Sequence, residues 1–151
     1  MHASSLIAIL LAAAAVAVPF PSVTVSQDHY EVLRLRASTT VDPTAVTGTT
    51  CTDTTTNIVF HDQNVAELAI CGGIAGAITK CGGAPTSTTG SSGSALFQLN
   101  AVTAGATINV SKGRWEGCVR AARAVCPTGS FSSTCVGGAS TGDVAFTLDA
   151  Q

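Results

Sequence analysis

The stretch SKGRWEGCVRAARAVCPTGSFSSTC, residues 111–135, holds three of the chain's six cysteines, its only tryptophan and four of its seven basic residues. Apolar residues recur at intervals of three or four between Trp115 and Cys126, which predicts an amphipathic helix over about residues 113–126. Ser111 is the expected N-cap, and a proline directly after Cys126 ends the helix. Because the apolar stripe must be covered, this helix is expected to pack on other elements of a folded domain.

Basic side chains occupy the opposite face of the same predicted helix, at Arg114, Arg120 and Arg123. A plain solvated helix face would carry such residues. A patch that binds an acidic or hydroxyl-rich ligand would carry them too. The pattern leaves both interpretations open.

The N-terminus predicts the compartment. Residues 6–18, LIAILLAAAAVAV, form an unbroken apolar run that is too short to cross a bilayer core of about 30 Å as a helix. The run contains Ala15-Val16-Ala17, which is typical of a signal-peptide cleavage site. We therefore expect residues 1–17 to be a secretory signal peptide, in preference to a membrane anchor, and the mature protein to be secreted and extracellular.

Secretion predicts the role of the cysteines. In an oxidising compartment, an even number of cysteines in a short chain indicates disulfides rather than metal ligands or reactive thiols. The sequence has no CxxC pair, and His61 is the only histidine in the cysteine-containing region. We expect three disulfides, no metal site and no cofactor. The cysteines are Cys51, Cys71, Cys81, Cys118, Cys126 and Cys135.

Helix geometry restricts how these cysteines pair. Cys118 and Cys126 are eight residues apart, which in one continuous helix is about 12 Å along the axis. A disulfide requires Cα atoms within about 7 Å, so these two cannot pair with each other. The same holds for Cys71 and Cys81 if their helix is unbroken, which the intervening glycine pair leaves open. We expect each helix to be tied to another part of the domain.

The charge of the chain excludes some partners. The formal net charge is −2 and only 11% of the residues are charged. A nucleic-acid-binding protein or one that binds an anionic membrane surface would carry a basic patch. We expect neither kind of partner, and after the signal run no segment is apolar enough to span a membrane.

Composition divides the rest of the chain into two parts. Residues 18–50 are rich in Thr and Ser and are predicted to be a disordered arm, of which residues 18–36 could also be a propeptide. The folded, cysteine-stapled domain is expected at residues 51–151.

Within this domain the pattern alternates strands and helices, and the predicted fold class is α+β. We expect a small antiparallel β-sheet with helices packed on it, in an αβα-sandwich-like arrangement stapled by disulfides. The expected elements are an edge strand at 57–60, a helix from Asn64 to Cys81 broken at its glycine pair, a surface loop at 82–94, a β-hairpin with arms at 95–102 and 106–110, and an alternating strand at 143–149.

No catalytic constellation is recognisable, so we expect no enzymatic activity. A Ser or Cys nucleophile needs a histidine base with an orienting acid, and His61 has only the sequence-adjacent Asp62. A glycosidase needs two facing carboxylates, and none of the domain's acidic residues stands in a recognisable motif.

The order of these segments resembles a known family. A cysteine-containing helix, ALFQLNAVTAGATINV, RWEGCVRAARAVC and CVGGASTGDVAFTLDA follow one another. The series is similar to the small secreted mushroom glycan-binding proteins of the Y-three type. In outline it also resembles fungal killer-toxin-like and necrosis-inducing-factor effectors, which share a cysteine-stapled αβ sandwich. The resemblance implies a carbohydrate-binding, lectin-like function, with an oligosaccharide or a glycoprotein glycan as partner. The alternative that it implies is an effector or toxin that acts on a protein or membrane target.

A lectin-like site would combine an aromatic ring with polar side chains. Trp115 is the candidate ring if its edge is exposed, and a core position is its alternative role. Lys112, Arg114 and Arg120 are the candidate polar groups near it. Asn109 opens an N-glycosylation sequon, Asn109-Val110-Ser111, and the sequence leaves its occupancy open.

Overall fold

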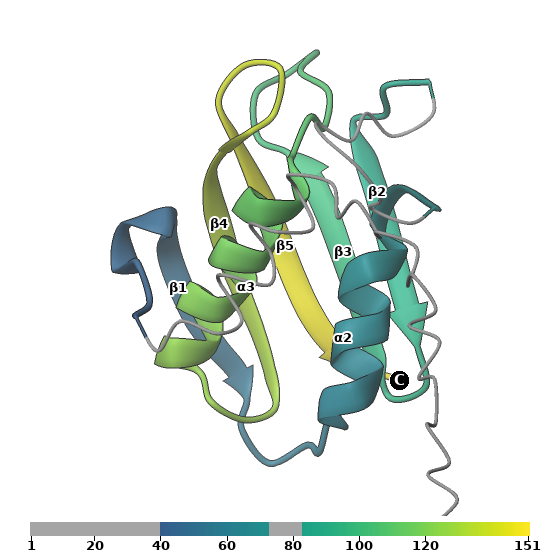
Figure 1. The fold of residues 1–151 in the computed structure, drawn as a ribbon, viewed down its shortest axis with the longest axis vertical. Coiled ribbons are helices and arrows are strands. Elements are labelled where there is room, and N and C mark those ends of the chain that lie inside the picture. Colours follow the sequence, from purple (N-terminus) through teal and green to yellow (C-terminus); the bar gives the residue numbers. More distant parts are fainter. Residues whose placement is uncertain (1–39, 73–82) are drawn as a thin grey trace, which may run out of the picture.

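The computed structural model describes residues 40–72 and 83–151. These residues form a five-stranded antiparallel sheet of order β1-β4-β5-β3-β2, and two α-helices cross one of its faces (Figure 1). The elements, in chain order, are η1 (Pro43–Ala45), β1 (Val46–Asp53), α2 (Phe60–Ala69), η2 (Ile70–Gly72), β2 (Ser87–Ser92), β3 (Ala95–Ala101), α3 (Lys112–Val125), β4 (Ser130–Gly138) and β5 (Asp143–Ala150).

The α+β class is confirmed, but the sandwich arrangement is not. Both described α-helices lie on the same face of the sheet, α2 over β2 and β3, and α3 over β4 and β1 (Figure 1). The side chains of β3 and β5 that point away from the helices include the polar Gln98, Asn100 and Thr147 as well as the apolar Leu96 and Ala145. Neither described α-helix is long and apolar enough to cross a membrane.

Strand β5 supplies the centre of the core, as its alternating sequence predicts. Val144, Phe146 and Leu148 are at most 1% exposed, whereas Ala145 and Thr147 between them are partly exposed. Successive side chains of a strand point to opposite faces, so the three apolar ones all meet the helices. Because β4 and β3 pair with β5 on either side, this row lies in the middle of the sheet.

An aromatic cluster joins this row to α3. The ring centroids of Trp115 and Phe146 are 5.0 Å apart, and those of Trp115 and Phe97 are 5.2 Å apart, both in edge-to-face geometry. Such pairs contribute about 0.5–1.5 kcal/mol each beyond the area that they bury. The helix itself begins as predicted, because the Ser111 hydroxyl accepts a hydrogen bond from the Arg114 N–H.

The folded domain begins earlier than residue 51. Strand β1 starts at Val46, inside the segment predicted to be a disordered arm, and pairs with β4. Thr residues suit a pleated, half-buried strand, so a Thr-rich tract forms an edge strand once a partner is present. Two register shifts interrupt this pairing; at the first, Gly48 with φ +64° and Thr49 stand opposite Ser133. Residues 1–39, including the predicted signal peptide, lie outside the described part of the chain.

The β-hairpin predicted between residues 95–102 and 106–110 does not form, because the first arm pairs with a different strand. Strand β3 does pair in a tight hairpin, but with β2, whose sequence STTGSS lies in the segment predicted to be a loop. The other predicted arm, 106–110, makes only an isolated bridge between Ile108 and Ala139. Strand β2 has no apolar alternation because most of its side chains face solvent. Its one buried residue, Gly90, lies against α2, where an added Cβ would be 2.3 Å from the Ala66 carbonyl oxygen.

The predicted edge strand at 57–60 is wrong: residues 57–59 form a connection without regular structure, and Phe60 is the first residue of α2. The helix begins without a side-chain cap at Val59, so Asn64 lies inside the helix and does not cap it. The predicted break near the glycine pair is present, since the helix gives way to η2 and Cys71 has the left-handed φ of +58°. The part of the predicted helix beyond Gly72 lies outside the described residues.

Two disulfides connect α3 to the sheet. Cys126 bonds to Cys51 of β1 and Cys118 bonds to Cys135 of β4, over sequence separations of 75 and 17 residues. As predicted, Cys118 and Cys126 do not pair with each other. Loops of these lengths give about 3–5 kcal/mol of stabilisation per disulfide in the chain-entropy description. Cys71 is also disulfide-bonded and no described cysteine is free, whereas Cys81 lies outside the described residues.

Gly129 marks the closest approach between the β1 end and the turn after α3. Its φ is +68°, and a Cβ added there would lie 1.8 Å from the Asp53 carbonyl oxygen. Gly105 has a similar φ of +77° but open space around the same position. Alanine substitutions at the two glycines therefore distinguish the free-energy cost of a left-handed backbone from the additional cost of a steric clash.

We expect Gly129→Ala to destabilise the protein by at least about 3 kcal/mol and Gly105→Ala by about 1 kcal/mol. Both substitutions incur the left-handed backbone penalty, but only the first forces Asp53 away. Urea unfolding followed by tryptophan fluorescence measures both values. Equal losses of unfolding free energy in the two variants would show that a Cβ at Gly129 does not clash with the Asp53 carbonyl.

Candidate functional site

A groove of about 450 Å³ lies between α2 and α3. Each helix packs mainly on the sheet, so their outer surfaces stay apart. The groove is walled by Phe60 and Val119 and by polar side chains: Gln63, Asn64 and Glu67 from α2, and Glu116, Arg120 and Arg123 from α3.

The aromatic ring of Phe60 is exposed to solvent. It is 75% exposed, although phenylalanine normally lies in a core. As the first residue of α2 it has no preceding helical turn to cover it. An exposed aromatic side chain at the mouth of a hollow is a feature of binding sites, since it offers apolar surface to a partner.

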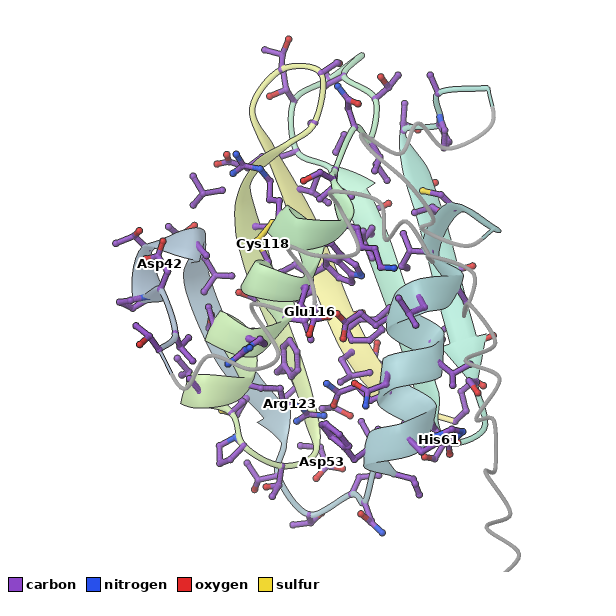
Figure 2. All side chains as sticks on the ribbon, viewed as in Figure 1. Asp42, Asp53, His61, Glu116, Cys118 and Arg123 are labelled. Atoms are coloured by element: carbon purple, nitrogen blue, oxygen red, sulfur yellow. A yellow bond between two sulfur atoms is a disulfide. The ribbon has the colours of Figure 1, made fainter. Side chains whose placement is uncertain are left out.

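The floor of the groove carries two buried carboxylates. Glu67 is 3% exposed and Glu116 is 6% exposed. Both make interactions within the protein, as does Arg120. Figure 2 shows Glu116 and Arg123 on the side of α3 that faces α2. Charged and amide groups held in fixed positions are the residue types that bind a polar ligand by directed hydrogen bonds.

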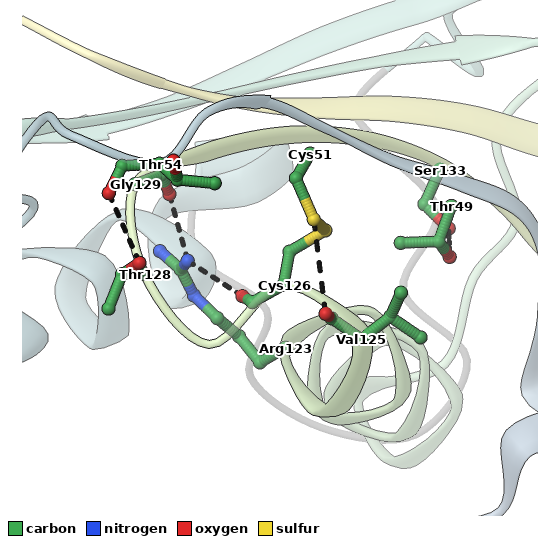
Figure 3. Close-up of a disulfide and its surroundings, with 9 residues drawn as sticks. All are labelled: Thr49, Cys51, Thr54, Arg123, Val125, Cys126, Thr128, Gly129 and Ser133. Atoms are coloured by element: carbon green, nitrogen blue, oxygen red, sulfur yellow. Dashed lines mark hydrogen bonds between the residues drawn. A yellow bond between two sulfur atoms is a disulfide. The ribbon is translucent and has the colours of Figure 1, made fainter.

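Arg123 joins α2, α3 and the turn after α3. Its Nε donates to Gln63 Oε1 at 2.8 Å. One terminal nitrogen donates to the carbonyl oxygens of Cys126 at 3.1 Å and Gly129 at 2.8 Å, as Figure 3 shows. The guanidinium also lies 5.0 Å above the Phe131 ring centroid. Partial burial lowers the pKa of Arg123 from its usual value, because desolvation disfavours the charge.

A second hollow of about 300 Å³ adjoins the groove and shares Phe60, Gln63 and Arg123 with it. Its other walls are two loops, residues 56–58 before α2 and residues 127–129 after α3. The Cys51–Cys126 disulfide and a 3.2 Å hydrogen bond from the Thr128 hydroxyl to the Thr54 carbonyl hold these loops together (Figure 3).

Asp53 shapes the loop on the β1 side of this second hollow. Its Oδ1 accepts from the Thr55 N–H at 2.8 Å and from the Thr55 hydroxyl at 2.7 Å, and its Oδ2 accepts from the Thr56 hydroxyl. The side-chain hydrogen bond from Thr56, followed by those from Thr55, holds the pKa of Asp53 well below its usual range. The charged form of Asp53 therefore stabilises the loop.

Trp115, the predicted stacking residue, lies in the core. It is 1% exposed, and its Nε1 donates to the Glu67 carbonyl oxygen at 3.0 Å. The exposed ring edge on which its ligand-binding role depends is therefore not present. Its position directly beneath the groove makes it a neighbour of the site and not a wall of it.

The structure brings one of the four predicted ligand-binding residues, Arg120, to the groove. Arg114 instead donates to the Val136 carbonyl oxygen at 2.7 Å, where it holds the irregular end of β4. Lys112 is buried at the start of α3 and has interactions within the protein. Trp115, Arg114 and Lys112 therefore do not line the groove.

The predicted glycosylation site, Asn109, lies in the connection before α3. Its backbone N–H donates to the Gly138 carbonyl at 2.7 Å, and its side-chain oxygen is buried without a hydrogen-bond partner. Ser111 of the sequon serves as the N-cap of α3. Occupancy of the sequon stays a prediction.

His61 and Asp62, the two residues considered for catalysis, lie in the first turn of α2. His61 lies on the far side of α2 from the groove (Figure 2). Asp62 accepts from the Ser94 N–H and hydroxyl, both at 2.9 Å, and so holds the β2–β3 turn. Within residues 40–72 and 83–151, no three His, Cys, Asp or Glu side chains are grouped as metal ligands.

The sequence did not indicate Phe60, Gln63 or Asn64 as site residues. NIVF reads as a β-branched strand that ends in a phenylalanine, and this interpretation placed Phe60 in the sheet. A usable signal was the polar run HDQN directly after it, which suits the first turns of a helix with one exposed aromatic at its start.

No protein-family model matches the chain, and no curated protein or solved structure is significantly similar to it. The resemblance to Y-three-type proteins therefore stays a prediction. Any function assigned to the chain depends on the geometry of the groove and on the sequence.

We expect Arg123→Ala to lower the free energy of unfolding by about 2–4 kcal/mol, because it removes three charge-assisted hydrogen bonds and leaves their acceptors unpaired. Arg123→Lys should recover only part of this loss, since an ammonium group cannot reproduce the planar fork. Arg114→Ala is the control: it removes one exposed hydrogen bond and should cost less than about 1 kcal/mol. Equal losses for both alanine variants in urea unfolding would contradict the joining role of Arg123.

The Asp53 hydrogen bonds predict acid sensitivity. The unfolded-state pKa is about 3.9, and the folded-state pKa lies below it, so the stabilisation is complete above about pH 4 and is lost as the pH falls. Asp53→Asn should be less stable than the native protein at pH 7 and should show a smaller loss between pH 5 and pH 2. Urea unfolding across this pH range measures both slopes. An unchanged slope in the variant would show that Asp53 does not contribute.

Proposed function

We propose that the protein is a secreted carbohydrate-binding, lectin-like protein without catalytic activity, and that it binds an oligosaccharide in the groove between α2 and α3. The observation that carries the proposal is the position of Phe60, a 75% exposed aromatic ring at the mouth of a groove with amide, carboxylate and guanidinium walls.

Sugars present two kinds of surface, and the groove has a group for each. The C–H groups on one face of a pyranose ring are apolar and slightly positive, so they pack on the negative face of an aromatic ring. The hydroxyl groups are both donors and acceptors. Gln63 and Asn64 supply both functions, whereas Glu67 and Glu116 accept and Arg120 donates.

The walls of the groove are held in place before a ligand arrives. Arg123 bonds to Gln63 on one side and to the turn after α3 on the other, and two disulfides fix α3 to the sheet. A site that is already ordered loses less conformational entropy when it binds. This favours recognition by a rigid surface over a mechanism that needs a moving lid.

The described part of the chain fits an extracellular protein. Its disulfides belong to an oxidising compartment, and it contains no helix able to cross a membrane. Secretion through residues 1–17, and a partner that is a free oligosaccharide or a glycoprotein glycan, are parts of the same proposal. No nucleic-acid partner is proposed, since the chain carries a formal net charge of −2.

We expect Phe60→Ala to weaken glycan binding by tenfold or more, a loss of about 1.4 kcal/mol or more in binding free energy. Stability should change by less than about 0.5 kcal/mol, because the ring is largely in water. A glycan array identifies ligands, and titration calorimetry on the hits gives the affinities of both proteins. Tryptophan fluorescence provides a second readout, since Trp115 is the only tryptophan and bonds to the backbone of Glu67 beneath the groove.

Val125→Ala is the matched control. Like Phe60, Val125 is an exposed apolar residue, with 58% of its surface in solvent, but it lines neither the groove nor the second hollow. Its removal should leave glycan affinity unchanged. A blank array would count against the carbohydrate function and favour the alternative, an effector or toxin that acts on a protein or membrane target.

A further inference from the structure

Phe60 stands between two hollows, and this position bears on the length of the ligand. The groove between α2 and α3 and the smaller second hollow share Phe60, Gln63 and Arg123. They are therefore adjacent compartments of one larger depression in the surface. A ligand confined to either compartment would meet the Phe60 ring at one side only. A chain that crosses the ring would use its exposed surface and both compartments.

The sizes of the hollows favour a chain. Small-molecule sites span about 300–1,000 Å³. The second hollow, at about 300 Å³, lies at the lower end of this range, and the groove, at about 450 Å³, lies in its lower half. Together the two hollows lie well inside it. The depression therefore suits a ligand with more than one sugar residue.

The two compartments also differ in chemistry. The groove contains three ionisable side chains of its own, Glu67, Glu116 and Arg120. Apart from the shared Arg123, the second hollow has no ionisable side chain; its own walls are Thr56, Asn57, Ile58, Pro127, Thr128 and Gly129. The Nε–H and one terminal nitrogen of Arg123 are already committed to protein acceptors. The second hollow thus suits a neutral unit that offers hydroxyl groups and an apolar ring face.

The second hollow is preformed. The Cys51–Cys126 disulfide and the Thr128–Thr54 hydrogen bond (Figure 3), with the close approach of Gly129 to the Asp53 carbonyl, tie the turn after α3 to the chain directly before the 56–58 loop. A wall with these three connections does not depend on the ligand for its shape.

We infer that the depression is a two-compartment site for a linear oligosaccharide of at least two units, with one unit in the groove between α2 and α3, a neutral unit in the second hollow and Phe60 beneath the link between them. The inference rests on the proposed carbohydrate-binding function and adds the minimum length of the ligand and the two compartments that it occupies.

Affinity as a function of chain length tests the inference. The probes are linear oligosaccharides of one to six units built from glucose, from N-acetylglucosamine and from mannose, measured by titration calorimetry against the full chain. In the series that binds, we expect affinity to rise by about tenfold or more from one unit to two, and to level off once both hollows are filled.

Two matched variants test the assignment of the hollows. Asn64→Leu alters the groove and Asn57→Leu alters the second hollow, each by exchanging an amide for a bulkier apolar side chain. Both variants should weaken binding of chains of two or more units. They should weaken binding of the single unit to different extents, because that unit occupies one hollow. Urea unfolding confirms that both variants are folded.

The possible results separate this inference from the proposed function. A blank glycan array counts against carbohydrate binding itself. An array with hits, combined with an affinity that is the same for one unit as for longer chains, overturns the two-compartment site alone. Hits on the array with no binding in any of the three linear series overturn it as well, since the ligand would then not be a linear chain of this kind.

Discussion

The indole N–H of Trp115 donates to the Glu67 carbonyl oxygen at 3.0 Å, and this bond joins α3 to α2 beneath the groove. The same ring packs edge-to-face against Phe97 of β3 and Phe146 of β5. One side chain of α3 therefore contacts α2 and two strands of the sheet, in addition to the two disulfides that tie α3 to β1 and β4. Because the bulk of Trp115 lies between the two helices at the level of the core, their outer surfaces stay separated. The hydrogen bond from Arg123 to Gln63 is a second connection between α3 and α2. The two hydrogen bonds together hold the helices at a fixed separation, which sets the width of the groove.

Sequence patterns predicted the elements that carry their own periodicity. Helix α3 shows an apolar stripe with a serine cap, and β5 alternates strictly, so both were located to within a few residues. Strands β1 and β2 were missed because they lie at the sheet edges and expose most of their side chains, and Thr, Ser and Gly leave no apolar signal there. The segment around Ile108 was taken for a strand because its apolar residues are buried, although the backbone around it pairs only once.

The site was less predictable than the fold. Arg120 could be selected because basic residues on the polar face of a predicted helix are visible in the sequence. Phe60 could not, since its importance comes from exposure, and exposure depends on where α2 begins. Glu67 and Glu116 lie 49 positions apart in the chain and line the same groove only because their helices pack on one sheet.

The interrupted pairing of β1 has a consequence for association. The strand is an edge of the sheet, and an unpaired edge can act as a template for a strand of another molecule. Two register shifts within its eight residues, one of them at the left-handed Gly48, twist the strand and break the regular row of outward N–H and C=O groups. A second chain therefore finds no long, flat ladder to extend. This edge resists sheet-to-sheet aggregation mainly through its backbone geometry, because its one charged side chain, Asp53, stands at the end of the strand.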